Sequence, residues 1–230
     1  MRLAIVIPAL NEAATIEPTL RALAPLRQRG VNVIVADGGS TDDTVARAAP
    51  LAERVVAAPR GRALQMNAGT RAPEAQAADV LLFLHADTAL PDDADRIVLR
   101  ALANSPRVWG RFDVVIEGRS PWLRVVGTMM NLRSRLSGIA TGDQAFFIER
   151  SSFLALDGFA PIPLMEDIEF CRRAKRLSRP LALRDRVRTS GRRWEQHGVW
   201  RTILLMWKLR WAFFLGADPI DLARRYRHSR

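Results

Sequence analysis

The stretch Asp79-Val80-Leu81-Leu82-Phe83-Leu84-His85-Ala86-Asp87 contains five apolar residues in a row, followed by a histidine and an aspartate. A short, continuous apolar run predicts a strand that is buried on both faces, as in the middle of a parallel sheet. In open α/β sheets, ligands bind beyond the carboxyl ends of the strands. We therefore expect Asp87 to lie at a ligand site, where its carboxylate is suited to a divalent cation. The alternative is that Asp87 caps the following helix or closes a turn.

Two similar strands precede this one in the chain. The first is predicted over Leu3–Ile7, ended by Pro8, and the second over Val31–Ala36. Apolar residues recur at helical spacing from Thr15 to about Gln28, and another helix is expected from Thr44. Alternating strands and helices predict an α/β fold, with a central, mostly parallel sheet flanked by helices and right-handed crossovers.

Polar residues follow each of these three strands. Asn11 and Glu12 come after the first, Asp37 after the second and Asp87 after the third. A single nucleotide site at the carboxyl edge of the sheet explains all of them. The chain has no glycine-lysine phosphate loop and no Gly-x-Gly-x-x-Gly after its first strand, which argues against P-loop enzymes and Rossmann dehydrogenases.

A basic segment, Arg60-Gly61-Arg62, follows a short predicted strand over residues 54–57 and opens another helix. Helix N-termini of this kind suit a phosphate group. The alternative is an ordinary solvated helix start. Residues 72–78 are predicted to be a polar linker.

The second half of the chain has a different pattern. Val108–Glu117 alternates apolar and polar residues, which predicts a more antiparallel strand with Arg111 and Asp113 on its polar face. Residues 122–136 are predicted to be irregular or helical. A further helix is expected to open at Glu166, where acidic residues in the first turn would favour the helix dipole.

The net charge of +11 and the pI near 11.4 favour an anionic partner. Lysine occurs only at Lys175 and Lys208, so the charge is nearly all arginine, and nucleic acid is not expected as the main partner. The single Cys171 excludes an intrachain disulfide. Because the chain enters a strand almost at once, without a signal peptide, we expect a cytoplasmic location.

In this order, the motifs resemble those of inverting family-2-type glycosyltransferases with the GT-A fold. The resemblance is to a small non-processive branch, with a hint of the group associated with arsenosugar biosynthesis. It covers roughly residues 3 to 170. The matching motifs are Ile5-Val6-Ile7-Pro8-Ala9-Leu10-Asn11-Glu12, Asp37-Gly38-Gly39-Ser40-Thr41-Asp42, the segment Gly61–Gly69, His85-Ala86-Asp87, Gly142-Asp143 and Glu166-Asp167.

The resemblance implies a role for each matching residue. Asp167 would be the catalytic base, and Glu166 would shape the site. Asp37 would accept a hydrogen bond from the nucleotide base, and Arg62 and Asn67 would lie near the ribose or the diphosphate. Asp87 would hold Mg²⁺ or Mn²⁺ against the diphosphate, with His85 as a second metal candidate. The residues implied in nucleotide-sugar binding are Pro8, Ala9, Asn11, Glu12, Asp37, Gly61, Arg62, Asn67, Ala86 and Asp87. Those implied near the acceptor or the diphosphate are Gly142, Asp143, Gln144, Arg193 and Trp194.

Two positions depart from the family pattern. The family usually has an acidic residue two positions before the metal-binding aspartate, where this chain has His85. The stretch Ser190-Gly191-Arg192-Arg193-Trp194 is similar to the Gln-x-x-Arg-Trp signature of processive members, but it has Ser190 in place of the glutamine. Arg193 would still reach the diphosphate, and Trp194 would stack on the acceptor. A hydrogen-bonded strand-end histidine and a basic loop are the alternatives.

We expect a catalytic domain over residues 1–190 and a helical extension over 191–230. In the domain, residues 1–105 would bind the nucleotide and residues 106–190 the acceptor. The apolar segment Val199–Leu215 is interrupted by Arg201, Lys208 and Arg210, so it is not expected to span a bilayer. It fits an interfacial membrane helix, a helix packed on the domain, or the contact of a homodimer. Membrane contact would suit a lipid-linked acceptor and a peripheral location on the inner face of the cell membrane.

The resulting hypothesis is a metal-assisted transfer of sugar from a UDP- or GDP-type donor to an acceptor hydroxyl, with inversion. One alternative is a sugar nucleotidyltransferase, which would need a glycine-rich phosphate loop after the first strand. Another is a degenerate, non-catalytic transferase that serves as an adaptor for a membrane or an anionic partner. His85 is the only feature that favours this last alternative.

Overall fold

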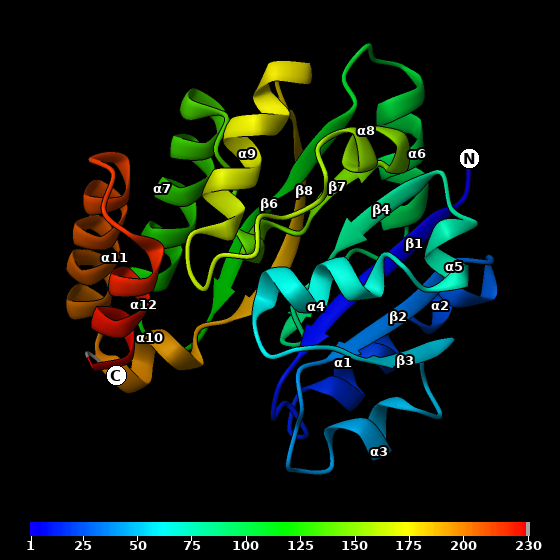
Figure 1. Ribbon diagram of the computed structural model, residues 1–230, viewed down its shortest axis with the longest axis horizontal. Helices are drawn as coiled ribbons and strands as arrows, with labels where there is room; N and C mark the ends of the chain where they lie inside the picture. Colours follow the sequence, from blue (N-terminus) through cyan, green and yellow to red (C-terminus); the bar gives the residue numbers. More distant parts are fainter. Residues whose placement is uncertain (229–230) are drawn as a thin grey trace.

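The computed structural model describes residues 1–228, in which an eight-stranded sheet carries helices on both faces (Figure 1). The strand order is β3-β2-β1-β4-β7-β6-β8-β5. The strands are β1 (Leu3–Ala9), β2 (Asn32–Asp37), β3 (Arg54–Ala57), β4 (Val80–Phe83), β5 (Thr88–Ala89), β6 (Trp109–Glu117), β7 (Phe146–Glu149) and β8 (Leu181–Ser190). The helices are α1 (Ile16–Ala22), α2 (Ala24–Gln28), α3 (Thr44–Ala48), α4 (Arg62–Gly69), α5 (Pro73–Gln76), α6 (Ala94–Ala103), α7 (Trp122–Ser137), the 3₁₀ turn η1 (Gly142–Gln144), α8 (Arg150–Ala155), α9 (Glu166–Leu177), α10 (Arg192–His197), α11 (Val199–Phe214) and α12 (Pro219–His228).

The first half of the sheet is parallel, as the sequence predicts. Strand β1 pairs in parallel with β2 and β4, and β2 pairs in parallel with β3. The second half is mixed, because β7 runs antiparallel to β4 and β6, while β8 runs parallel to β6. The carboxyl ends of β1, β2 and β4 therefore meet at one edge of the sheet, and the polar residues after them are brought together.

Each face of the sheet has its own apolar core. Along β1, Leu3, Ile5 and Ile7 belong to one core, while Ala4 and Val6 belong to the other. Helices α1, α2, α6 and the start of α7 contribute to the first core, and α4, α5, α8 and α9 to the second. Burial on both faces explains the unbroken apolar runs of β1 and β4, and each fully buried Ile or Leu contributes about 1.5–3 kcal/mol.

Strand β1 continues through Pro8 to Ala9, so the prediction that Pro8 ends it is wrong. The pairing of β1 with β4 stops at Val6, whose carbonyl accepts from the N–H of Leu84. Backbone groups two residues apart point to the same side of a strand. An N–H at position 8 would point to the side of β1 that faces away from β2, where β4 no longer pairs with β1. The missing N–H of Pro8 therefore leaves the hydrogen bonds between β1 and β2 undisturbed.

The helix predicted from Thr15 to Gln28 is two helices, α1 and α2, because Pro25 lies in the first turn of the second. The predicted linker over residues 72–78 contains the short helix α5. Residues 122–137 form the regular helix α7. Strands β5 and β8 and helix α8 were not anticipated.

The predicted polar face of the strand at 108–117 is also partly wrong. Arg111 is fully buried, because β6 is an interior strand and α7 packs over the face that carries this side chain. The alternation of β6 therefore separates two covered faces instead of a covered and a solvated one.

Helices α10, α11 and α12 follow β8, and they lie at one end of the molecule beside α7 and α9 (Figure 1). The division of the chain at residue 190 stays a prediction. Leu209 of α11 and Leu222 of α12 are buried in the second core. Among the described residues, no helix has the length and apolarity that a membrane span requires.

Candidate active site

The carboxyl ends of β1 and β2 are joined by the side chain of Gln65, which no sequence motif had singled out. The amide nitrogen of Gln65 donates to the carbonyl of Ala9 (2.6 Å) and to that of Ala36 (3.1 Å). Gly38 packs against this amide, and a Cβ at Gly38 would lie 2.9 Å from it. Helix α4 is thereby fixed to both strand ends, and its basic N-terminus is placed at the same edge of the sheet.

Asp37, the predicted partner of the nucleobase, is buried at the end of β2. One of its carboxylate oxygens accepts from the backbone N–H groups of Gly39 and Ser40, each at 3.0 Å. The other accepts from the Ser40 hydroxyl at 2.5 Å. Asp37 therefore organises the loop after β2, and its remaining lone pairs are the ones that a nucleobase would use. Contact with a base stays a prediction.

The loop after β1 is connected to the loop after β2. Asn11 has a left-handed backbone (φ 53°), and its side-chain oxygen accepts from the N–H of Thr41 at 2.8 Å. The N–H of Glu12 donates to the Thr44 hydroxyl at 2.8 Å. The carboxylate of Glu12 lies 3.7 Å from the guanidinium of Arg192 in α10. The predicted donor pocket residues Pro8, Ala9, Asn11 and Glu12 thus lie at one place, next to the predicted acceptor segment.

Glu166 and Asp167 open helix α9 and face the start of α4. A side-chain nitrogen of Arg62 lies 3.3 Å from a carboxylate oxygen of Glu166, which is buried. The side chain of Arg62 is 39% exposed, so it can also contact a ligand. Burial by itself lowers the pKa of Arg62, but Glu166, Asp167 and Asp143 raise it above its ordinary value. The guanidinium is therefore charged at every physiological pH.

Asp167 has the electrostatics of a general base. Burial, followed by repulsion from Glu166, raises its pKa from 3.8 to about 6, while Arg62 opposes the rise. Its carboxylate accepts from the N–H of Gly142 (3.2 Å) and from that of Ile168 (2.8 Å). A base with a pKa near 6 is ionised at neutral pH and still binds a proton appreciably.

The 3₁₀ turn η1 places the Gly142-Asp143 segment between Asp167 and the end of β4. Nδ1 of His85 lies 3.2 Å from a carboxylate oxygen of Asp143. Nε2 of His85 is buried without a hydrogen-bond partner, and a Cβ at Gly142 would lie only 2.3 Å from it. Glycine is thus required at position 142. His85 faces this loop, and its role as a metal ligand stays a prediction.

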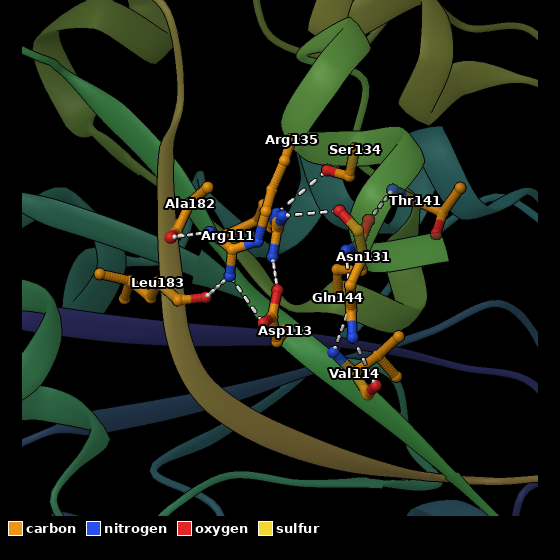
Figure 2. Close-up of polar contacts among 10 residues, drawn as sticks. All are labelled: Arg111, Asp113, Val114, Asn131, Ser134, Arg135, Thr141, Gln144, Ala182 and Leu183. Atoms are coloured by element: carbon orange, nitrogen blue, oxygen red, sulfur yellow. Dashed lines mark hydrogen bonds and ion pairs between the residues drawn. The ribbon is translucent and has the colours of Figure 1, made fainter. Parts of the chain in front are cut away.

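A buried polar network connects η1 to α7 and β6 (Figure 2). The side-chain amide of Gln144 donates to the side-chain oxygen of Asn131 in α7 at 3.2 Å. Asn131 is itself fixed to β6 by two hydrogen bonds with the backbone of Val114 (2.8 and 3.0 Å). Gln144, predicted near the acceptor, is fully buried and therefore positions the loop.

The same network contains charged residues that sequence reasoning missed. Arg111 of β6 donates to the Ser134 hydroxyl (3.0 Å) and pairs with Asp113, which also accepts from Arg135 (2.6 Å). Arg135 also donates to the carbonyls of Ala182 and Leu183 in β8 (Figure 2). The only available signal was the charge of these residues within an apolar strand and helix.

The side-chain amide of Asn67, predicted near the ribose or the diphosphate, forms two hydrogen bonds with the backbone of Phe159. Its nitrogen donates to the Phe159 carbonyl (2.8 Å), and its oxygen accepts from the Phe159 N–H (2.9 Å). Phe159 belongs to an aromatic cluster with Phe83 and Phe170, at ring-centroid distances of 4.9 and 4.5 Å. In this arrangement Asn67 connects α4 to the segment before α9, and its contact with a ligand stays a prediction.

Three other predicted positions can be placed. Gly61, at the N-cap of α4, has φ 140°, a conformation that favours glycine. The carbonyl of Ala86 accepts from the Thr19 hydroxyl at 2.7 Å. Trp194 lines a hollow of about 460 Å³ together with Arg119 and Val199. The side chain of Arg193 lies outside the described part of the structure, so its contact with the diphosphate stays a prediction.

The donor set at the end of β4 fits a metal that takes most of its ligands from a substrate. Asp87 is half-buried there, and the described residues contain no cluster of three or more His, Cys, Asp or Glu side chains able to hold an ion. Mg²⁺ commonly binds one or two protein carboxylates and takes its other ligands from phosphates and water. A single carboxylate beside the basic N-terminus of α4 is compatible with that mode and does not fit a metal cage built from protein ligands alone.

The half-parallel sheet, with Glu166 and Asp167 opposite Arg62 at the edge of its parallel strands, has the architecture expected of a GT-A glycosyltransferase fold. The chain belongs to the family described as "Glycosyl transferase family 2", whose model matches residues 4–156. Glucosyl-3-phosphoglycerate synthase of Mycobacterium tuberculosis is 38% identical over 98 residues, which cover 39% of this chain and 30% of that protein. The succinoglycan biosynthesis protein ExoA of Rhizobium meliloti is 41% identical over 106 residues, covering 43% of this chain and 32% of that protein. The alignments thus cover under a third of both relatives.

Solved structures share the fold. The M. tuberculosis synthase, in complex with Mn²⁺, UDP and glucosyl-3-phosphoglycerate, superposes with a TM-score of 0.59 at 23% identity, over 82% of this chain and 70% of that one. TarS residues 1–349 from S. aureus superposes with a TM-score of 0.66 at 18% identity, over 88% of this chain and 64% of that one. These likenesses confirm the predicted GT-A architecture.

Proposed function

We propose that this protein transfers a sugar from a nucleoside-diphosphate sugar to an acceptor hydroxyl, with inversion. The observation that supports the proposal most directly is the position of Asp167 and Glu166 opposite Arg62, at the edge of the sheet where the loops after β1, β2 and β4 converge. Related structures have been solved with UDP and Mn²⁺, with UDP and Mg²⁺, and with UDP-GlcNAc. The arsenosugar grouping stays a prediction.

In the proposed reaction, Asp167 accepts the proton of the attacking hydroxyl. Its raised pKa keeps the carboxylate basic, and the N–H of Gly142 orients one of its oxygens. Glu166 holds Arg62 beside the base, where the guanidinium limits the repulsion between the two carboxylates. Direct attack by the hydroxyl from the side opposite the leaving group inverts the anomeric carbon.

The donor is proposed to lie over the carboxyl ends of β1 and β2, with Asp37 at the base and Arg62 at the diphosphate. Asp87 would hold Mg²⁺ or Mn²⁺, which when bound neutralises the negative charge on the departing nucleoside diphosphate. This arrangement offers no glycine-rich phosphate loop after β1, so a nucleotidyltransferase is not favoured.

The release of nucleoside diphosphate from UDP- and GDP-sugars, in the presence of Mg²⁺ or Mn²⁺, tests the reaction. Wild type should release one nucleotide slowly even to water, and Asp167→Asn should reduce this rate by about 10²–10⁴-fold, the usual contribution of a general base. Asp185→Asn, which changes an exposed carboxylate in β8, serves as the control. Equal rates for wild type and Asp167→Asn would contradict the role of Asp167.

We further propose that the enzyme works on a membrane surface with anionic lipids. Helix α11 exposes an apolar stripe, and α7 exposes another; the rings of Trp122 and Trp200 join them at 4.9 Å. The stripes comprise Trp200, Leu204, Trp207, Trp211 and Phe214 on α11, and Trp122, Val125, Met129, Leu132 and Leu136 on α7. Exposed basic residues accompany the stripes, namely Arg124 on α7 and Arg201 and Lys208 on α11, and neither helix carries an acidic residue. Apolar stripes with basic neighbours fit an anionic bilayer better than a second copy of this cationic chain.

Sedimentation with vesicles tests the membrane proposal. The protein should bind vesicles that contain phosphatidylglycerol and bind neutral phosphatidylcholine vesicles much more weakly. The double variant Trp207→Ser and Trp211→Ser should lose binding, whereas Leu177→Ser, an exposed apolar residue of α9, should retain it. A concentration-dependent dimer that is lost in the double variant, without vesicle binding by wild type, would favour the homodimer instead.

A further inference from the structure

The buried side-chain atoms that lack hydrogen-bond partners gather around η1. Among the described residues, such nitrogen and oxygen atoms occur on His85, Arg133 and Arg210, and a fourth side chain, Thr141, caps η1 by accepting from the N–H of Gln144 but donates its hydroxyl to no group. Nε2 of His85 lies against Gly142, and Thr141 directly precedes it. Arg133 of α7 interacts electrostatically with Asp143, Asp167 and Cys171, and the Cys171 thiol contacts the carbonyl of Ala140. Three of the four side chains therefore lie in or beside residues 140–143.

Arg133 differs from the other three because two nitrogen atoms of one permanently charged side chain are affected, whereas only one atom is affected in Arg210. Its Nε and Nη2 atoms are both buried and both unpartnered. Burial lowers the pKa of Arg133, while Asp167 and Asp143 raise it, and an arginine remains charged in any protein. A buried charged donor without an acceptor is unfavourable, so the site is incomplete without an acceptor.

The two unpartnered atoms lie on one edge of the guanidinium. Five other arginines among the described residues use the same Nε and Nη2 edge to bind a carboxylate, namely Arg21, Arg29, Arg54, Arg173 and Arg188. This edge presents two parallel N–H groups that match the two oxygens of a carboxylate or a phosphate. Arg133 offers the same edge without a protein carboxylate on it.

We propose that Arg133 binds an anionic group, phosphate or carboxylate, on the acceptor substrate, with the Thr141 hydroxyl as an additional donor. This inference deepens the proposed transferase function and rests on it. Arg133 lies in α7, within the half of the chain predicted to bind the acceptor, whereas the proposed donor pocket is built from the ends of β1 and β2 and from α4. An anionic group bound there places a hydroxyl of the same molecule within reach of the base.

The binding of inorganic phosphate and of acetate, measured by calorimetry, tests this assignment. Each anion is titrated into nucleotide-free protein and into protein saturated with UDP and Mg²⁺, which blocks the donor site. Variants Arg133→Met and Arg133→Lys are compared with wild type and with Arg124→Met, which removes an exposed arginine from the same helix. Melting temperatures show whether each variant is folded.

Wild type and Arg124→Met should bind at least one of the two anions, with or without UDP. Arg133→Met should bind it at least about tenfold more weakly, and Arg133→Lys should also be weaker, because it keeps the charge but loses the paired donors. UDP affinity should be the same in all four proteins.

If wild type binds neither anion, or if Arg133→Met binds as tightly as wild type, the assignment is wrong. It is also wrong if the loss is in UDP affinity, because Arg133 then serves the donor. Failure of UDP to bind wild type would instead count against the proposed function, while the nucleotide-free titration would still report on Arg133.

Discussion

Replacing Asp167 by asparagine is expected to stabilise the folded protein while removing its activity. The carboxylate is held in a place that disfavours its charge, because burial and the neighbouring Glu166 raise its pKa from 3.8 to about 6. Each unit of pKa corresponds to about 1.4 kcal/mol, so ionised Asp167 costs at most about 3 kcal/mol of folding free energy. Because Asp167 is only half-buried and asparagine resembles the protonated acid, we expect a net gain of roughly 1–3 kcal/mol at about pH 8.

The gain should depend on pH with a defined sign. The folded state of wild type binds a proton below about pH 6, whereas the unfolded chain stays ionised down to about pH 4. Wild type therefore gains stability as the pH falls through this window. The advantage of Asp167→Asn should shrink by about 1.4 kcal/mol between about pH 8 and about pH 5.

Urea unfolding followed by tryptophan fluorescence, without nucleotide or metal, measures both effects. Asp185→Asn, which neutralises an exposed carboxylate, should show no comparable gain and no comparable pH dependence. If Asp167→Asn is less stable than wild type at about pH 8, or if its advantage is constant across the window, then Asp167 is not held in a strained, base-like state.

Four further outcomes are expected. Asp95→Asn should destabilise the protein by roughly 1–3 kcal/mol at neutral pH, because hydrogen bonding to Arg29 lowers the pKa of Asp95. In urea unfolding, this loss of stability should disappear as the pH falls below about 4. Arg111→Met leaves its aspartate partner half-buried and only partly compensated, and should lower the unfolding free energy by about 3–5 kcal/mol. Gly142→Ala should reduce turnover but leave UDP affinity within about threefold, since its Cβ would displace His85 and move the loop that orients the base. The rate of nucleotide release should rise with pH through about 6, as Asp167 loses its proton, and then level off.

The parallel half of the fold could be predicted because its sequence signals are local. Strands β1, β2 and β4 are short apolar runs, and each is followed directly by polar residues. A strand that is buried on both faces requires such a run. The sequence pattern alone therefore indicates where these strands lie and in what order they follow one another along the chain. The site residues after them follow from the rule that carboxyl ends of parallel strands share an edge.

The remaining features depend on contacts between distant segments. Strand β8 has an exposed, arginine-rich middle, so no apolar run marks it, and it forms by pairing with β6 some seventy residues earlier. The burial of Arg111 depends on α7 covering β6, and Gln65 matters only because two strand ends meet beside it. The unpartnered edge of Arg133 can be recognised only in the folded structure, where no acceptor among the described residues lies beside it. Residue type alone carries no signal for Gln65 or for the unpartnered edge of Arg133, and for Arg111 the only signal was a charge within an apolar strand.

The binding of UDP and of GDP, measured by titration calorimetry with Mn²⁺, with Mg²⁺ and with a chelator, tests the nucleoside-diphosphate site most directly. Wild type should bind one of the two nucleotides in a metal-dependent manner. Asp87→Ala should lose the metal dependence, whereas Asp79→Ala, at the other end of β4, should retain it. If neither nucleotide binds wild type with any metal, the GT-A fold in this chain does not carry the proposed activity, and the adaptor alternative would be favoured.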